Sequence, residues 1–324
     1  LFETKTITLT GVGRTGEAKI YKVTSDLKEA LKDVDVILPV IPAYTQVAFA
    51  KEIAPYIQKG HKIILAPGST GGALVVAKTL HELGKLEGVK IGEYHTLPYA
   101  TRKTGPTSVN VLLKCNKLFF AAFPAKYNDE MYQIAKQIFP AAQLVSSVLE
   151  TSLNNGNPIS HPAPVLLNAG KIEHSKGEHY HYKDGISPSV ARVLEKMLAE
   201  RKVIFNKFGY SVMDSKEKLY SLGYAPKRDT LYECYRDSEV FKKIKGPKDL
   251  DSRYLTEDTP YSLVALASIA DLVGVDTPVM DSVITLASAL KDENYWETGR
   301  GVKDLGIDGM SIDEIKEFLY EGYK

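Results

Sequence analysis

One histidine lies in a segment whose neighbours suit a catalytic site. His161 belongs to the run Asn157-Pro-Ile-Ser-His161-Pro162-Ala-Pro164-Val-Leu-Leu-Asn168. If this run is helical, His161 and Asn168 are about two turns apart on one face, and Asn157 joins them if the helix starts early. Pro162 and Pro164 suit a first helical turn, so we expect His161 at or near the helix start. We assign proton transfer to His161 and substrate binding to the two amides; the alternative is a buried, hydrogen-bonded histidine or a cap.

A second polar cluster follows further along the chain, in the run Arg253-Tyr-Leu-Thr-Glu257-Asp258-Thr-Pro260. Asp258 could hold the imidazole of a catalytic histidine and stabilise its protonated form. Arg253 could bind a substrate carboxylate through two parallel hydrogen bonds. Because Pro260 starts another apolar helix, Asp258 can equally be interpreted as the N-cap of that helix.

Residues 1–149 alternate strand and helix signals. Short apolar runs predict the strands, and amphipathic runs predict the helices between them. The expected strands are residues 34–40, 62–65, 89–93, 108–113, 117–123 and 143–147, and the expected helices are residues 45–57, 73–83 and 128–139. This alternation indicates a Rossmann-like parallel sheet that helices cover on both faces.

Residues 150–324 show helix signals in place of the earlier alternation, and they predict an all-helical domain that carries the catalytic and substrate groups. A long amphipathic helix is expected at residues 189–208, where Gly209 ends it. Further helices are expected at residues 216–222, 229–243, 261–273 and 278–290, and the last helix opens with the capping box of Ser311 and Glu314.

One glycine motif, Gly11-Val-Gly13-Arg-Thr-Gly16, matches the dinucleotide-binding fingerprint by its letters. Such glycines hold a diphosphate only where a strand precedes them and a helix follows. The β-branched run of residues 17–24 is too short for that helix. We therefore interpret the motif as the turn of a β-hairpin and expect the true fingerprint upstream of this chain. The choice between NAD and NADP, which usually rests on that unit, stays open.

Other cofactor contacts are expected at the carboxyl ends of the strands, where open α/β sheets bind their ligands. The residues at these positions are Pro39, Pro42, Ala43, Pro67 and Gly68. Proline and glycine are also common where strands simply end in turns, and this structural alternative stays open.

The composition argues against several other classes of function. The 324 residues have a formal net charge of +1, which predicts no nucleic-acid surface. The longest apolar stretch, residues 34–43, is too short to cross a membrane. Two cysteines are too few for a disulfide framework and suit a reducing cytoplasm. His174, His179 and His181 lie in polar surroundings, and we expect no metal site.

The chain resembles the octopine/nopaline (opine) dehydrogenase family, and the resemblance covers nearly its whole length. Residues 157–162, followed by Asn168-Ala-Gly170, resemble the catalytic-histidine segment of that family. Residues 253–261 resemble the block that supplies its aspartate and an active-site arginine, and residues 93–102 resemble a segment lining its cleft. The N-terminal glycine-rich loop of the family has no counterpart in this chain.

The resemblance implies a Rossmann-like domain, incomplete at its N-terminus, and a helical domain like that of 6-phosphogluconate dehydrogenase. It implies that the enzyme condenses an amino acid with a 2-oxo acid, using NAD(P)H, and catalyses the reverse oxidation. His161 and Asp258 would be catalytic, Arg253 would bind a carboxylate, and a homodimer is one possible assembly. Two alternatives stay open: a related two-domain reductase of a 2-oxo acid or a sugar-phosphate ketone, and a non-catalytic, truncated homologue.

Overall fold

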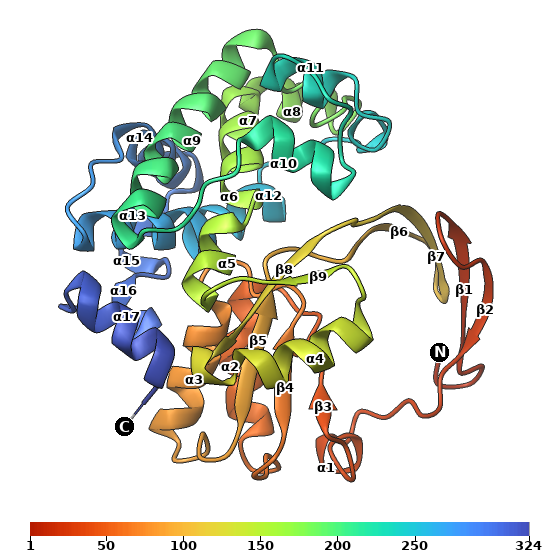
Figure 1. Cartoon of the computed structure of the whole chain (residues 1–324). Helices are drawn as coiled ribbons and strands as arrows, with labels where there is room; N and C mark the ends of the chain where they lie inside the picture. The colour runs from red at the N-terminus through yellow and green to blue at the C-terminus, as the bar shows by residue number, and fades with distance from the viewer. Residues whose placement is uncertain (324) are drawn as a thin grey trace.

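A mixed five-stranded sheet forms the centre of the first half of the chain (Figure 1). The computed structural model describes residues 1–323. The strand order is β3-β4-β5-β8-β9, with β3 Val36–Ile37, β4 Lys62–Leu65, β5 Lys90–Tyr94, β8 Leu118–Phe123 and β9 Ala142–Leu144. The α/β architecture is confirmed, but the expectation of an entirely parallel sheet is wrong at one pair, because β5 and β8 run antiparallel. A β-hairpin rather than a crossover helix joins these two strands, so the chain re-enters the sheet in the opposite direction.

Helices cover both faces of this sheet, as expected. Strand β4 shows why: Ile63 and Leu65 belong to one apolar cluster, while Ile64 belongs to the other. Consecutive side chains of a strand point to opposite faces, so each face needs its own cover. The first face packs against α2 (Gln46–Ile53), α3 (Gly72–Glu82) and α5 (Val148–Asn154), and the second against α4 (Asn128–Ile138).

Strand β3 is shorter than its apolar run of residues 34–40 predicts. It lies at the edge of the sheet and pairs only with β4, through Val36 and Ile37. Pro39 has no N–H to donate, so the ladder cannot continue through it. Only the carbonyl of Pro39 is used, accepting a hydrogen bond from Ala66 N–H (3.0 Å).

The glycine motif forms a hairpin turn, as predicted. Strands β1 (Thr6–Gly11) and β2 (Gly16–Lys19) pair antiparallel, and Leu9 lies opposite Gly16. This hairpin belongs to a second sheet of order β2-β1-β7-β6, formed with the long arm of β6 (Tyr99–Gly105) and β7 (Ser108–Lys114). Figure 1 shows this sheet to one side of the main sheet, so residues 11–16 lie away from the carboxyl ends of β3 to β5.

The second half of the chain is helical. Its helices are α6 (Asn157–Ser160), α7 (Pro162–Leu167), α8 (Ala169–Ser175), α9 (Pro188–Phe208), α10 (Ser215–Leu222), α11 (Leu231–Arg236), α12 (Arg253–Thr256), α13 (Val264–Leu272), α14 (Pro278–Lys291), α15 (Tyr295–Thr298), α16 (Val302–Leu305) and α17 (Ile312–Glu321). A single-turn helix, α1 (Leu27–Ala30), precedes β3. The long helix α9 ends at Gly209 (φ +76°), as expected.

One expected helix, residues 229–243, is interrupted. Helix α11 ends at Arg236, and the chain resumes only as a 3₁₀ turn at Phe241–Lys243. Ser238 causes the break, because its hydroxyl accepts hydrogen bonds from the N–H groups of Val240 (3.2 Å) and Phe241 (2.9 Å). Serine side chains of this kind compete with helical hydrogen bonds.

The end of the chain returns to the sheet domain. Phe318 of α17 packs against Phe123 of β8, with ring centroids 5.1 Å apart, and α16 contacts α3 (Figure 1). The division into residues 1–149 and 150–324 therefore stays a prediction, although all strands precede residue 145. Within residues 1–323, no helix is long and apolar enough to cross a membrane.

Candidate active site

His161 lies at a break between two short helices, not within one helix as its spacing suggested. It is the last residue bonded to α6, through its N–H to Asn157 O (3.0 Å), and it opens α7, where its carbonyl accepts Val165 N–H (3.2 Å). Pro162 ends the first helix because it lacks the N–H that would continue the ladder, and it suits the first turn of the next. The break turns the imidazole of His161 away from the helix axis into a cavity.

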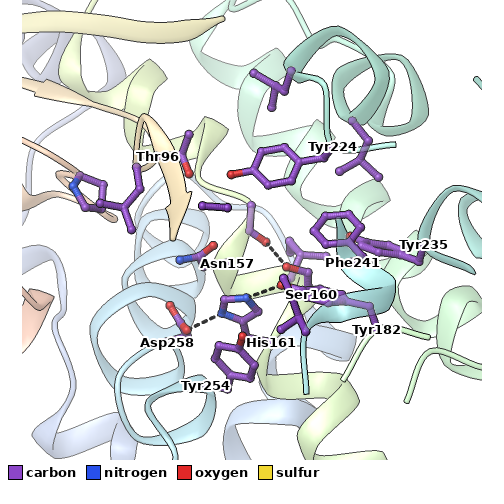
Figure 2. A pocket seen from close by; sticks show the side chains of 18 of the residues that line it. Thr96, Asn157, Ser160, His161, Tyr182, Tyr224, Tyr235, Phe241, Tyr254 and Asp258 are labelled. Carbon is purple, nitrogen blue, oxygen red and sulfur yellow. Dashed lines mark hydrogen bonds and ion pairs between the residues drawn. The ribbon is translucent and has the colours of Figure 1, made fainter. Parts of the chain in front are cut away.

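Both ring nitrogens of His161 are hydrogen-bonded (Figure 2). Nδ1 lies 2.7 Å from Asp258 Oδ2, and Nε2 lies 2.8 Å from the Tyr182 hydroxyl. An ionised carboxylate can only accept, so Nδ1 carries the proton and Nε2 of the neutral ring is the acceptor. Burial raises the pKa of Tyr182 well above its usual value, so its hydroxyl keeps its proton and donates to Nε2. The ring is therefore set as a base whose Nε2 lone pair accepts the Tyr182 hydroxyl in the wall of the cavity.

The Asp258 side chain binds His161 and makes no capping hydrogen bond to the following helix. It stands at the N-cap position of the π-helical turn Thr259–Leu263, but its side chain makes no capping hydrogen bond. The turn is closed by Leu263 N–H to Asp258 O (2.9 Å), and such π turns often occur at functional sites. Burial raises the pKa of the Asp258 carboxyl, while the neighbouring His161 opposes this effect. The N-cap interpretation is therefore right about the position of Asp258, but the side chain makes no capping hydrogen bond.

Aromatic rings that the sequence did not single out support the imidazole. Tyr254 stacks on His161 with a centroid distance of 4.0 Å and an interplanar angle of 23°. His181 lies edge-on to His161 at 5.7 Å and hydrogen-bonds through Nε2 to Ser160 O (3.0 Å). The residues around His181 are polar and predicted polar surroundings, but both His181 and Tyr182 are buried. No group of three metal-binding side chains occurs within residues 1–323.

The cavity beside His161 has a volume of about 530 Å³ and lies between the two halves of the chain. The sheet half contributes residues that follow β4 and β5, namely Pro67, residues 95–97 and residues 99–102. The helical half contributes residues from α6, α9 and α10, together with residues 252–254, Glu257 and Asp258. A cavity of this size is typical of a small-molecule site.

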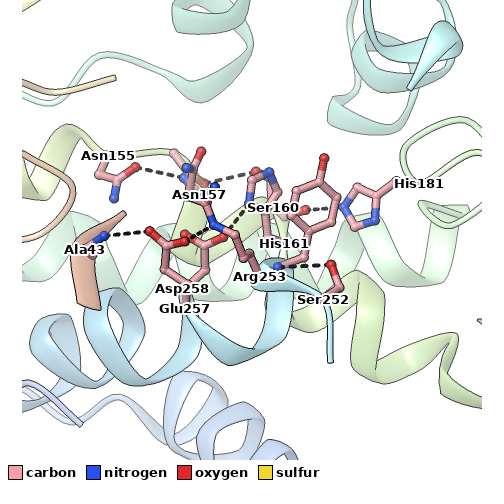
Figure 3. A network of polar contacts seen from close by, with 12 residues as sticks. Ala43, Asn155, Asn157, Ser160, His161, His181, Ser252, Arg253, Glu257 and Asp258 are labelled. Atoms are coloured by element: carbon pink, nitrogen blue, oxygen red, sulfur yellow. Dashed lines mark hydrogen bonds and ion pairs between the residues drawn. The ribbon is translucent and has the colours of Figure 1, made fainter. Parts of the chain in front are cut away.

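Arg253 lies at the edge of this cavity in a short network (Figure 3). Its Nε donates to Glu257 Oε2, and the other oxygen of Glu257 accepts Ala43 N–H (2.8 Å). Glu257 therefore joins α12 to the loop after β3. The Arg253 side chain is 62% exposed, so its terminal amino groups can reach a ligand. Glu257 was missed at the sequence level, where it appeared only as a neighbour of Asp258.

The two amides assigned to substrate have different surroundings. Asn157 lines the cavity, and Figure 2 shows its side chain near His161 and Asp258. Asn168 does not line it. Its amide donates instead to the carbonyls of Pro164 (2.8 Å) and Gly185 (2.9 Å), holding the turn between α7 and α8. The structure therefore brings Asn157, but not Asn168, to the site.

The residues expected to contact the cofactor lie at the carboxyl ends of β3 and β4, but only Pro67 lines the cavity. Ala43 and Gly68 use their N–H groups within the protein, on Glu257 and on Tyr94 O (3.0 Å). Pro42 opens a 3₁₀ turn, where its carbonyl accepts the Thr45 hydroxyl (2.8 Å). Of these five expected cofactor contacts, Pro67 therefore lies in the cavity wall.

Gly68 is packed too closely to carry any side chain. A Cβ atom there would lie 2.0 Å from Glu93 Oε2, a buried group. We expect Gly68→Ala to lower the free energy of unfolding by about 1–3 kcal/mol, the usual cost of overpacking. The matched control is Gly170→Ala in α8, where nothing lies within 4 Å. Urea unfolding measures both; equal stability of the two variants would contradict this explanation.

Glu93 is a buried carboxyl at the end of β5. It accepts hydrogen bonds from Thr151 and Ser152 at Oε1 and from Ala73 N–H (2.8 Å) at Oε2. Burial raises the pKa of Glu93 to about 7, although the Thr151 hydroxyl lowers it in part. The folded protein therefore keeps a proton on this group at pH values where the unfolded chain, with a pKa of about 4.5, has lost it.

This shift predicts a pH-dependent stability. The contribution of Glu93 is fully present below about pH 4.5 and is lost as the pH rises through about 7, a change on the order of 3 kcal/mol. Glu93→Gln removes the titrating group, so the stability of the variant should fall less than that of the wild type over this range. Urea midpoints at about pH 5 and about pH 8 measure the difference, and parallel changes in the two proteins would refute it.

Comparisons with known proteins agree with this architecture. Residues 144–291 match the family described as NAD/NADP octopine/nopaline dehydrogenase, alpha-helical domain. The opine dehydrogenase of Arthrobacter sp. (strain 1C) is 38% identical over 306 residues, covering 94% of this chain and 84% of that protein. A structure of octopine dehydrogenase in complex with NADH and agmatine has a TM-score of 0.80 at 20% identity, covering 100% of this chain and 88% of that one.

A structure of yersinopine dehydrogenase with bound NADP⁺ has a TM-score of 0.71 at 18% identity, covering 98% of this chain and 87% of that one. The two structural likenesses show the fold. The identity to the Arthrobacter protein extends over both halves of the chain and shows the family. This chain belongs to the octopine/nopaline (opine) dehydrogenase family, whose members are NAD(P)-dependent dehydrogenases acting on CH–NH bonds.

Proposed function

We propose that this chain condenses the amine of an amino acid with the carbonyl of a 2-oxo acid and reduces the product with NADH or NADPH. The observation that carries the proposal is the buried, hydrogen-bonded pair of His161 and Asp258 in the wall of the cavity. Family membership supports the reaction class. The product would be a secondary amine that carries two carboxylates.

His161 would make two proton transfers in this reaction. An ammonium group cannot attack a carbonyl, so Nε2, once the substrate displaces the Tyr182 hydroxyl from it, first takes a proton from the amino acid. The free amine then adds to the 2-oxo acid, and the imidazolium returns its proton to the departing hydroxyl, which leaves as water. Asp258 balances the positive charge of the ring during this interval. The reduced nicotinamide, when bound, supplies the hydride that completes the secondary amine.

Two further residues would position the substrates. The exposed amino groups of Arg253 suit a carboxylate at the mouth of the cavity, while Glu257 holds its Nε side. The Asn157 amide would hydrogen-bond to a substrate near His161. Pro67 would contact the nicotinamide end of the cofactor on the sheet side.

The experiment is a substrate matrix with purified protein. We expect oxidation of NADH or NADPH when an amino acid and a 2-oxo acid are present together, and little oxidation with either alone. Oxidation that needs only the 2-oxo acid would instead support a simple 2-oxo acid reductase. A folded protein that oxidises neither nucleotide under any condition would support the non-catalytic alternative.

We also propose that the protein works in a reducing cytoplasm. Cys115 and Cys234 are both free and buried, and a thiol-specific reagent should label them only after unfolding. A homodimer stays one possible assembly, and light scattering of the purified protein would measure it.

A further inference from the structure

Two basic side chains lie buried in the cavity wall with only neutral partners. Arg201 of α9 is 7% exposed, Lys218 of α10 is 8% exposed, and both line the cavity. Within the described chain, the hydrogen-bond acceptors of both are uncharged: Asn155 O for Arg201 (2.7 Å), and Asn154 O and Oδ1 for Lys218. Buried cations are normally paired with an acid, so this pair lacks its counter-charge.

The two cations are close together. Their acceptors belong to consecutive residues where α5 ends, and helix carboxyl ends carry partial negative charge that makes this placement tolerable. Burial and then the neighbouring Arg201 lower the pKa of Lys218, and burial lowers that of Arg201 to about 10. An anion between them would raise the pKa values of both groups again.

A third donor faces the same part of the cavity. His95 is 1% exposed and lines the cavity, and its Nδ1 accepts Phe119 N–H (3.1 Å). The neutral ring therefore carries its proton on Nε2, which has no hydrogen-bond partner within residues 1–323. The pKa of His95 is held well below its usual value by burial and by the neighbouring Lys218 and Arg201. The ring therefore stays neutral, and its buried Nε2–H has no acceptor within residues 1–323.

We propose that Arg201, Lys218 and His95 form a subsite for a substrate carboxylate, separate from Arg253. A carboxylate accepts from a guanidinium in bidentate fashion and can also accept from an ammonium and a ring N–H. Arg253 differs because it already pairs with Glu257 and lies at the exposed edge. The inference rests on the proposed function, whose product has two carboxylates: each cationic site would take one.

The carboxylate could come from the amino acid or from the 2-oxo acid, and the experiment separates these sources. Each substrate is compared with its own primary amide, which has the same shape but no charge. The variants are Arg201→Met and Lys218→Met. The matched controls are Arg192→Met on α9 and Lys216→Met on α10, of which Arg192 is exposed and Lys216 half-buried.

The measured quantity is the ratio of kcat/KM for each acid to that for its amide. We expect each subsite variant to reduce this ratio by roughly 10- to 100-fold for one substrate only, as for loss of a charge-assisted hydrogen bond, and the controls to keep it. The affected substrate identifies the source of the carboxylate. Equal losses for acid and amide, or unchanged ratios for both substrates, would overturn the subsite.

Binding of the condensed product gives a second readout that needs no turnover. The product should raise the melting temperature of the wild type more than that of Lys218→Met, and equal shifts would overturn the proposal. Different results would contradict the proposed function and the carboxylate subsite. If the wild type reduces the 2-oxo acid without using any amine, the proposed function fails; if it condenses both substrates and the variants keep their acid-to-amide ratios, only the subsite fails.

Discussion

Replacing His161 with alanine is expected to lower kcat about 10²–10⁴-fold, the usual contribution of a positioned acid–base group. Neither hydrogen-bond partner of the ring can take over, because Tyr182 keeps its proton and Asp258 lies on the far side of the imidazole (Figure 2). The fold should persist, since the lost volume opens into an existing cavity that water can fill. Steady-state kinetics and thermal melting measure the two effects.

The matched control for this variant is His174→Ala. His174 is exposed on α8 and bonds only to Gly170 O, so its loss should leave kcat unchanged. A His161→Ala protein that is folded and turns over at the wild-type rate would show that the ring is structural.

Replacing Asp258 with asparagine is expected to lower kcat by roughly 10²–10⁴-fold while changing the melting temperature little. The amide of asparagine can donate to Nδ1 and so favours the tautomer with its proton on Nε2, which cannot act as a base. It also cannot balance the charge of the imidazolium. Because the Asp258 side chain caps no helix, stability should not depend on it in the way an N-cap would.

Kinetics and melting of this variant separate the two roles of Asp258. Normal turnover with a markedly lower melting temperature is the behaviour of a lost helix cap, and it would contradict the catalytic assignment. Ser311→Ala is a suitable reference, because Ser311 caps α17 with both halves of a capping box and lies outside the cavity lining.

The pairing of His161 with Asp258 could be predicted from the family resemblance, whereas the helix spacing predicted a different neighbour for His161. Seven-residue spacing placed His161 and Asn168 on one helix face, whereas the proline-rich run breaks into three short helices and directs Asn168 elsewhere. The pairing itself joins residues 97 positions apart in the chain. Periodicity describes neighbours within one element, so only the family resemblance could connect these two segments.

The glycine motif shows where local context is sufficient. Its letters suggest a nucleotide loop, but the β-branched residues that follow it cannot form the helix that such a loop requires. The hairpin of β1 and β2 follows from that local conflict alone. Burial of Tyr182, in contrast, depends on Tyr235 of α11 and on Phe241, which pack over a segment of largely polar residues.

The sequence contains one signal of the proposed carboxylate subsite. Arg201 follows Met197 by four residues and precedes Ile204 by three, so it lies on the apolar stripe of α9. A charge on such a stripe is either paired in the core or facing a ligand. Lys218 gave no such signal, because α10 has only a short apolar face, and its burial arises from packing beside α5.

The proposed reductive condensation is tested most directly by following the hydrogen that the reduced nicotinamide transfers. Wild-type protein is incubated with an amino acid, a 2-oxo acid and NADH or NADPH deuterated at the transferable position, and the products are analysed by mass spectrometry. We expect one secondary amine dicarboxylate with a single deuterium on the former carbonyl carbon. The His161→Ala variant should form this product far more slowly. A deuterated 2-hydroxy acid beside unreacted amino acid would contradict it.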